Sequence, residues 1–304
     1  MPAEPLFPGF DRGRARVGAG ASAVEISYVK GGNGPALLLL HGFPQSHAMW
    51  HRVAGRLAER HTVVAADLRG YGDSSKPEGG AGHGGYSKRA MAADQVALMR
   101  ALGHERFMVA GHDRGGRVAH RLALDHPGAV SRLMVLDIAP TLSMYESTDL
   151  TFATVYWHWF FLIQKEPLPE TLIGADVEFM FRKFMGGRHA GMDAFAPEAW
   201  REYIRCASDP ATVHAMCEDY RAARTIDLEH DRKDRDAGRR LEIPLRVLWG
   251  EFGGLARCFD PLAHWRGYAS DVDGRALPCG HYIAEELPDA LLEECVAFFP
   301  AHAP

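Results

Sequence analysis

The heptapeptide Gly111-His112-Asp113-Arg114-Gly115-Gly116-Arg117 decides the fold. It follows a short apolar run and opens a helical pattern, which is the sequence context of a nucleophile elbow, a tight turn between a strand and a helix. The glycines supply the small residues that such a strained turn requires. Its central residue is an aspartate. A carboxylate is a nucleophile that needs no deprotonation and can displace a leaving group from saturated carbon, whereas a serine there would indicate acyl transfer.

Apolar runs of strand length alternate with helical patterns on both sides of this turn, which predicts βαβ units and a parallel sheet. The runs predicted as strands are residues 36–40, 62–66, 106–110, 133–138, 244–249 and 273–277. Between Pro140 and residue 240 the pattern is helical and lacks a strand. We therefore expect an α/β core formed by residues 1–140 and 241–304, with an all-helical cap, residues 141–240, inserted into it.

The composition excludes several classes of protein. The chain has 304 residues, a net charge of −5 and five cysteines without CxxC spacing, and its pI is near 6.3. This charge gives no reason to expect nucleic acid or an anionic membrane as a partner. The cysteine pattern indicates neither a disulfide framework nor a zinc site. Because no apolar stretch reaches the length of a membrane span, a cytoplasmic protein is expected.

The chain contains one densely charged run, HDRKDRDAGRR, at residues 230–240. The run mixes acids with bases and contains no interleaved aromatic side chains. This pattern argues against a nucleic-acid patch, and we interpret the run as a solvated linker.

Two more segments carry candidate catalytic groups. His41-Gly42-Phe43-Pro44 follows the strand at residues 36–40, and the DLRGYGDS segment follows the next strand. With the elbow, these segments resemble an α/β-hydrolase in order and spacing. The backbone N–H groups of Phe43 and Arg114 would then form an oxyanion hole.

Hydrolysis of an aspartyl ester requires a base that activates water, and the base needs an acid to orient it. His281 is the strongest base candidate because it follows the last predicted strand and precedes the C-terminal helix. Asp137, at the end of its predicted strand, is the preferred acid. Asp260 and Glu251 are the alternatives.

Arg114 and Arg117 indicate the substrate. Arg114 adjoins the proposed nucleophile and Arg117 lies one helical turn further on, so both guanidinium groups can face one pocket. Guanidinium forks bind carboxylates in bidentate fashion. The pair therefore predicts an anionic substrate held against Asp113.

Over nearly its full length the chain resembles the fluoroacetate dehalogenases, the haloacetate-hydrolysing branch of the α/β-hydrolases. The resemblance covers HGFPQSHAMWHRVA, DLRGYGDSSKP, GHDRGGRVAHRLALDHP, VLDIAPT, YWHWFFLIQ, Tyr220 and the Gly280-His281 pair. It implies that Asp113 displaces halide, that Arg114 and Arg117 bind the substrate carboxylate, and that Asp137 pairs with His281. It also implies a halide pocket formed by His158, Trp159 and Tyr220.

The expected reaction is hydrolysis of a haloacetate to glycolate and halide through a covalent ester on Asp113. Three N–H and O–H donors converging on one small anion would stabilise the charge that develops on departing fluoride, and chloroacetate is a further expected substrate. We expect no metal and no organic cofactor. The resemblance suggests a homodimer.

Two alternatives stay open. An epoxide hydrolase would use the same aspartate, histidine and acid, with Tyr220 and Tyr203 protonating the epoxide oxygen. A neutral epoxide, however, gives no reason for two arginines in the pocket. A ligand-binding protein that keeps the fold without turnover is the other alternative, although the intact set of candidate catalytic residues argues against it.

Overall fold

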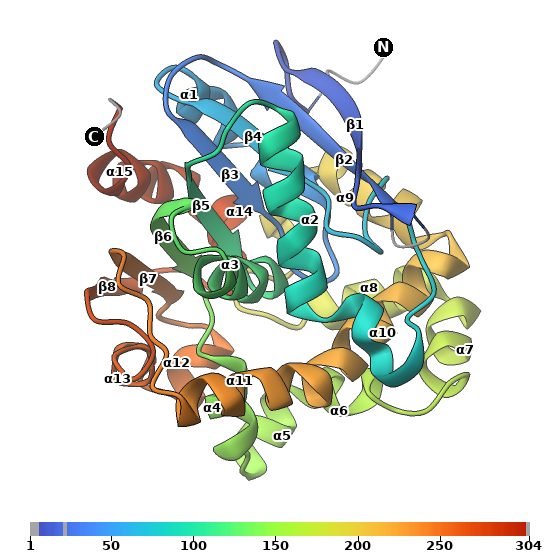
Figure 1. Cartoon of the computed structure of the whole chain (residues 1–304). Helices are drawn as coiled ribbons and strands as arrows, with labels where there is room; N and C mark the ends of the chain where they lie inside the picture. Colours follow the sequence, from blue (N-terminus) through green and yellow to red (C-terminus); the bar gives the residue numbers. More distant parts are fainter. Residues whose placement is uncertain (1–5, 21–22, 302–304) are drawn as a thin grey trace.

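The computed structural model describes residues 6–20 and 23–301, and their central feature is an eight-stranded sheet (Figure 1). The strand order is β1-β2-β4-β3-β5-β6-β7-β8. Strand β2 pairs antiparallel with β1 and with β4, and all later pairings are parallel. The strands are β1 (Asp11–Val17), β2 (Val24–Gly31), β3 (Ala36–Leu40), β4 (Thr62–Ala66), β5 (Phe107–His112), β6 (Val130–Leu136), β7 (Leu245–Gly250) and β8 (Val272–Leu277). The mostly parallel central sheet that the predicted fold class requires is thus confirmed.

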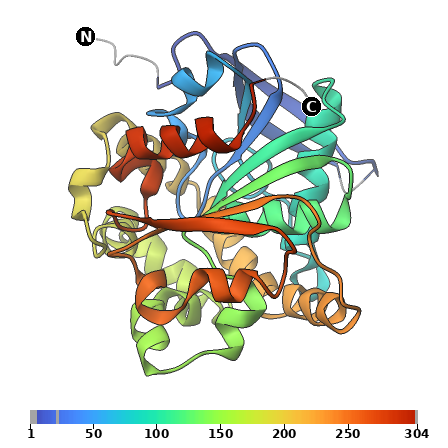
Figure 2. The ribbon, with the colours of Figure 1, turned by 90° about the vertical axis from the view of Figure 1, so that its left-hand side faces the viewer.

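Helices cover both faces of the sheet, with α2 and α3 on one face and α15 on the other (Figures 1 and 2). The helices outside the segment between β6 and β7 are η2 (His47–Trp50), α1 (Ala54–Ala58), η3 (Ala81–Tyr86), α2 (Lys88–Ala101), α3 (Arg114–Asp125), α12 (Gly254–Cys258), α13 (Pro261–Trp265), α14 (Ile283–Glu286) and α15 (Pro288–Phe298).

The segment between β6 and β7 is helical throughout its described elements. Its helices are α4 (Thr141–Glu146), α5 (Leu150–Val155), α6 (Trp157–Leu162), α7 (Leu168–Ala175), α8 (Val177–Met185), η4 (Gly191–Ala194), α9 (Pro197–Ala207), α10 (Pro210–Arg224) and α11 (Ile226–Asp236). Helices α5, α6 and α11 lie along the lower part of Figure 1, below the sheet. No helix in the described part of the chain is long and apolar enough to cross a membrane.

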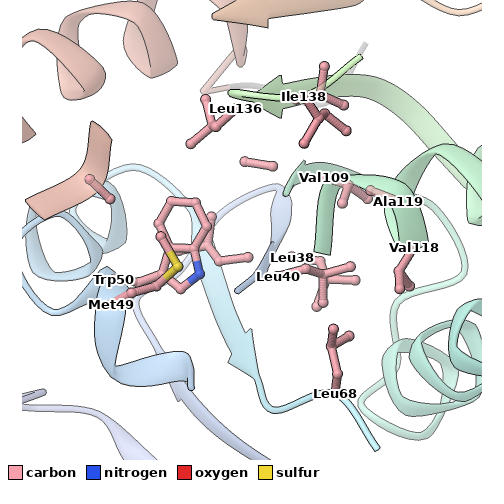
Figure 3. Packing of buried hydrophobic residues seen from close by; sticks show 14 of the residues in the cluster. Leu38, Leu40, Met49, Trp50, Leu68, Val109, Val118, Ala119, Leu136 and Ile138 are labelled. Carbon is pink, nitrogen blue, oxygen red and sulfur yellow. The ribbon is translucent and has the colours of Figure 1, made fainter. Parts of the chain in front are cut away.

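The core is centred on strands that are apolar on both faces, as parallel strands covered by helices require. All five residues of β3, Ala-Leu-Leu-Leu-Leu, are buried. Leu38 of β3 is paired with Val109 of β5, and both belong with Leu40 and Val118 of α3 to one buried cluster (Figure 3). This packing fixes β5 and α3 relative to each other, and with them the turn that holds Asp113.

Two features of the fold differ from the sequence prediction. Strands β1 and β2 were not predicted, because β1 is an edge strand with exposed arginines and lacks a strong apolar pattern. The interpretation of residues 230–240 as a solvated linker is wrong for its first part, which belongs to α11. There Asp231 and Asp234 are buried and form ion pairs with Arg121 of α3. The acids of this run therefore attach α11 to the core.

Candidate active site

Asp113 lies at the turn between β5 and α3, with φ of 45° and ψ of −115°. Few residues other than glycine adopt a positive φ, and such strain is typical of nucleophile elbows. The chain can reverse tightly here because Gly111 and Gly115 stand two residues before and two residues after Asp113. A Cβ atom on Gly115 would lie 2.3 Å from the carbonyl oxygen of His41, and one on Gly42 would lie 2.5 Å from Cβ of Asp113. Both glycines permit close approach of backbone to the nucleophile.

The environment of Asp113 keeps its carboxylate ionised. Burial alone would raise the pKa of Asp113, but His281 and the guanidinium groups of Arg117 and Arg114 outweigh burial and hold the pKa well below its ordinary value. The backbone N–H of Phe43 donates to Oδ1 of Asp113 at 3.2 Å. Helix α3 begins at Arg114, so the first N–H groups of that helix also lie beside Asp113. Of the two backbone donors predicted for the oxyanion hole, the Phe43 N–H contacts this carboxylate, and the Arg114 N–H lies at the start of the helix that follows it.

His281 and Asp137 are brought together as predicted. Nδ1 of His281 lies 2.5 Å from Oδ2 of Asp137, and the other carboxylate oxygen accepts a hydrogen bond from the Gly250 N–H at 3.0 Å. Both side chains are buried. Burial lowers the pKa of His281, which favours the neutral imidazole that a base requires. This pair leaves Nε2 of His281 as the nitrogen that can accept a proton.

The two alternative acids lie elsewhere. Asp260 accepts a hydrogen bond from the Ala263 N–H at 3.0 Å and caps α13. Glu251 is exposed. Of the three carboxylates considered from the sequence, only Asp137 contacts His281 in the described structure.

Arg114 is held by a carboxylate that the sequence analysis missed. Asp219 of α10 accepts hydrogen bonds from Nε and Nη2 of Arg114, at 3.1 and 2.7 Å. Lys88 and Tyr71 also donate to this carboxylate. The Nε and Nη2 groups of Arg114, which were expected to bind the substrate carboxylate, are thus already bonded to Asp219. Nη1 of Arg114 is buried and has no hydrogen-bond partner among the described residues. The only sequence signal was an acid beside the cap residue Tyr220.

Arg117 is also fixed on one side and open on another. Its Nη1 donates to the carbonyl of Ala139 at 3.0 Å and to the hydroxyl of Thr141 at 2.9 Å. Its Nε is buried and finds no hydrogen-bond partner in the described structure. Arg114 and Arg117 therefore each have one nitrogen free to bind a ligand, and neither presents a complete bidentate pair of donors.

The three side chains predicted to bind halide are buried next to these arginines. The ring centroid of Tyr220 lies 6.1 Å from that of His158 and 6.1 Å from that of Trp159. The Arg114 guanidinium carbon lies 4.1 Å from the Tyr220 centroid, and that of Arg117 lies 4.8 Å from the Trp159 centroid. Nε1 of Trp159 and the hydroxyl of Tyr220 lack hydrogen-bond partners within the described chain. Two uncommitted donors thus share one buried region with Asp113.

The tyrosines proposed for epoxide opening are not equivalent. The hydroxyl of Tyr203 donates to Oε1 of Glu285 at 2.9 Å and accepts from Gln45, so it is already engaged. Tyr156, which was not selected from the sequence, has a buried hydroxyl without a partner in the described residues, and its ring lies 6.0 Å from His158. Tyr156 and Tyr220 are therefore available as tyrosine donors near the site, and Tyr145 and Tyr282 also have buried hydroxyls without a partner in the described residues.

A cavity of about 500 Å³ leads to this region between the helical segment and the core. Its lining includes the buried side chains of His158 and His281. Among the described residues no group of three or more histidine, cysteine or acidic side chains is arranged to hold a metal ion.

Comparisons with known proteins agree with this architecture. The model of the α/β-hydrolase fold family matches residues 35–287. A fluoroacetate dehalogenase from Burkholderia sp is 49% identical over 285 residues, which cover 93% of this chain and 92% of the relative. A soluble epoxide hydrolase from Corynebacterium sp. (strain C12) is 36% identical over 279 residues, 90% of this chain and 93% of that protein.

Among solved structures, one from Nostoc sp PCC 7120, assigned to the α/β-hydrolases, is 54% identical to this chain. It superposes with a TM-score of 0.90 and covers 95% of this chain and 98% of its own. The resemblance identified from the sequence motifs is confirmed by the Burkholderia relative. The chain therefore belongs to the α/β-hydrolase fold family.

Proposed function

We propose that the protein hydrolyses haloacetates to glycolate and halide. The observation that carries this proposal is the presence of an ionised Asp113 in one buried site with Arg114 and Arg117, each of which has an unused N–H group. A buried pair of guanidinium groups favours an anionic ligand, and a carboxylate nucleophile favours displacement at saturated carbon. Support also comes from the 49% identical relative, which is a fluoroacetate dehalogenase.

The proposed reaction has two steps. Asp113 attacks the α-carbon of the haloacetate, the carbon–halogen bond breaks, and the halide leaves with the bonding pair toward His158, Trp159 and Tyr220. His281, oriented by Asp137, then takes a proton from water, which attacks the carbonyl carbon of the Asp113 ester. The N–H groups of Phe43 and Arg114 stabilise the resulting oxyanion. The intermediate collapses, the bond between its carbon and the glycolate oxygen breaks, and that oxygen takes the proton held by His281. Asp113 returns to its carboxylate form by releasing one proton to solvent, and glycolate departs.

Halide release and oxygen labelling test this mechanism together. The wild type should release halide from chloroacetate and fluoroacetate, and Asp113→Asn should lower the rate by at least ~10⁴-fold, since loss of a nucleophile removes most catalysis. In a single turnover in heavy-oxygen water, the new oxygen of glycolate should be unlabelled because it comes from Asp113. Label in first-turnover glycolate would exclude the ester route.

Epoxide hydrolysis is the second candidate. It is favoured by the uncommitted hydroxyls of Tyr156 and Tyr220 and by the 36% identical epoxide hydrolase. Assays with styrene oxide and chloroacetate, run side by side at equal enzyme concentration, separate the two. Faster turnover of the epoxide, with little halide release, would favour the second candidate.

A further inference from the structure

Arg188 is a cation of the cavity that the proposed reaction does not use. It follows α8, is half-buried, and lines the same cavity as His158 and His281. Its Nε donates to the carbonyl of Phe184 at 3.4 Å, and its guanidinium carbon lies 5.8 Å from the ring centroid of Tyr282. Within the described ranges, no carboxylate lies within ion-pair distance of it. Leaving a half-buried guanidinium without a counter-ion is costly, which favours an anionic ligand at this position.

The surroundings of Arg188 are also basic. Lys183 and Arg257 line the outer part of the cavity, and no aspartate or glutamate is among the described residues that line it. A cavity lined by positive charges attracts anions. The carboxylate of a haloacetate, however, is already served by Arg114 and Arg117, so a monoanion adds no direct contact to Arg188, whose nearest negative charges are the more distant Asp113 and Asp137.

The charge of Arg188 changes the pKa values of histidines in the active site. Burial lowers the pKa of His158 and the charge of Arg188 lowers it further, and the same two causes act in that order on His281. Arg188 therefore belongs electrostatically to the active site rather than to the outer surface.

The volume of the cavity points in the same direction. A space of about 500 Å³ is of the size that holds drug-sized ligands, which are much larger than a haloacetate. We propose that Arg188 is the centre of a second anion subsite, which binds the distal carboxylate of a short haloacid with two carboxylates, such as a 2-halosuccinate. This inference rests on the proposed function for the chemistry at Asp113, but the binding it describes can be measured without turnover.

Calorimetric titration with unreactive ligands tests the subsite directly. Acetate, malonate and succinate are titrated into the wild type and into Arg188→Met. The wild type should bind at least one of the two dianions about 10-fold more tightly than acetate, because a second charge-assisted contact is added. Arg188→Met should abolish this preference and weaken acetate binding much less than dianion binding. Arg188→Lys, which keeps the charge, should retain part of the preference. It keeps the proposal testable if the methionine variant fails to fold.

Arg16→Met is the matched control, because it removes one positive charge from the exposed strand β1, remote in sequence from the cavity lining. The dianion preference should survive in this variant. The proposal is overturned if the wild type shows no preference, if Arg188→Met weakens all three ligands equally, or if Arg16→Met has the same effect as Arg188→Met. The last two results would show long-range attraction instead of a subsite.

Turnover gives the second readout. Chloride release from 2-chlorosuccinate should fall at least 10-fold in Arg188→Met relative to release from chloroacetate. A wild type that turns over neither compound contradicts the proposed function, whereas equal losses on both compounds contradict the subsite alone.

Discussion

Asp219 of α10 holds Arg114 of α3 through two hydrogen bonds, from Nε at 3.1 Å and from Nη2 at 2.7 Å. Both side chains are completely buried. The charges of Arg114 and Lys88 outweigh burial and lower the pKa of Asp219 to about 2, so this carboxylate is ionised. One residue of the helical segment thereby sets the direction in which the unused Nη1 of Arg114 points.

Replacing Asp219 should therefore affect both stability and substrate binding. Asp219→Asn leaves Arg114 without its counter-ion and leaves Lys88 with only the more distant Asp227. Breaking a buried ion pair costs about 3–5 kcal/mol of unfolding free energy. We also expect the KM for chloroacetate to rise more than kcat falls. Urea unfolding and steady-state chloride release measure these effects. Glu178→Gln, which breaks an exposed ion pair with Arg182, is the control and should change neither quantity. An unchanged KM in a folded Asp219→Asn protein would show that Arg114 keeps its orientation without this carboxylate.

Lysine should not replace either arginine of the site. In Arg117→Lys the ammonium group cannot both reach Ala139 and Thr141 and retain a separate Nε–H donor for the substrate. We expect KM for chloroacetate to rise at least ~10-fold in Arg117→Lys and in Arg114→Lys, since each loses a charge-assisted hydrogen bond. Arg201→Lys, at an exposed ion pair, is the matched control. Wild-type kinetics in both site variants would show that Arg114 and Arg117 do not bind the substrate carboxylate.

Removing the base should trap the ester. Without His281 the first step can proceed, but water is not activated to attack the Asp113 ester. His281→Asn should release about one halide per enzyme molecule and then stop. Intact-protein mass spectrometry should show the mass of one added carboxymethyl group, absent from an Asp113→Asn/His281→Asn double variant. Continued turnover by His281→Asn would mean that another group is the base.

Glu285 should make stability depend on pH. It is buried beside Tyr203 and Gln45, and burial raises its pKa from the ordinary 4.5 to about 8. The folded state therefore holds a proton that the unfolded chain releases. This contribution is complete below pH 4.5 and declines as the pH rises toward 8, by up to ~1.4 kcal/mol per pH unit.

Urea unfolding between pH 5 and pH 8 measures this slope. Glu285→Gln keeps a neutral side chain of similar shape and should flatten the pH dependence. If both proteins lose stability equally over this range, Glu285 is not the responsible group.

Much of the site could be predicted because its residues occupy fixed places in the topology. Asp113, Asp137 and His281 each follow a parallel strand, and the carboxyl ends of parallel strands meet at one edge of the sheet. Apolar runs defined those strands, with β3 and β4 matching at both ends. The order of the strands in the chain was therefore enough to expect these side chains to be neighbours.

Other residues could not be predicted, because their roles depend on helix packing. Asp219 and Arg188 lie on or beside helices whose orientation relative to Asp113 has no signature in their own sequence. The helical pattern predicted between Pro140 and residue 240 likewise gave no sign of the break at Tyr156 between α5 and α6. Charged side chains on one helix are ordinarily solvated, and only the partner helix shows which of them are buried.

The adjacency of Asp219 and Tyr220 on one helix has a consequence for substrate length. Asp219 fixes the arginine proposed to bind the carboxylate, and Tyr220 is proposed to receive the halide. Because neighbouring residues of a rigid helix cannot separate, the distance between the group that binds the carboxylate and the group that receives the halide is fixed. Under the proposed function, the enzyme therefore distinguishes acids with halogen on the carbon next to the carboxylate from those in which an extra methylene separates the two.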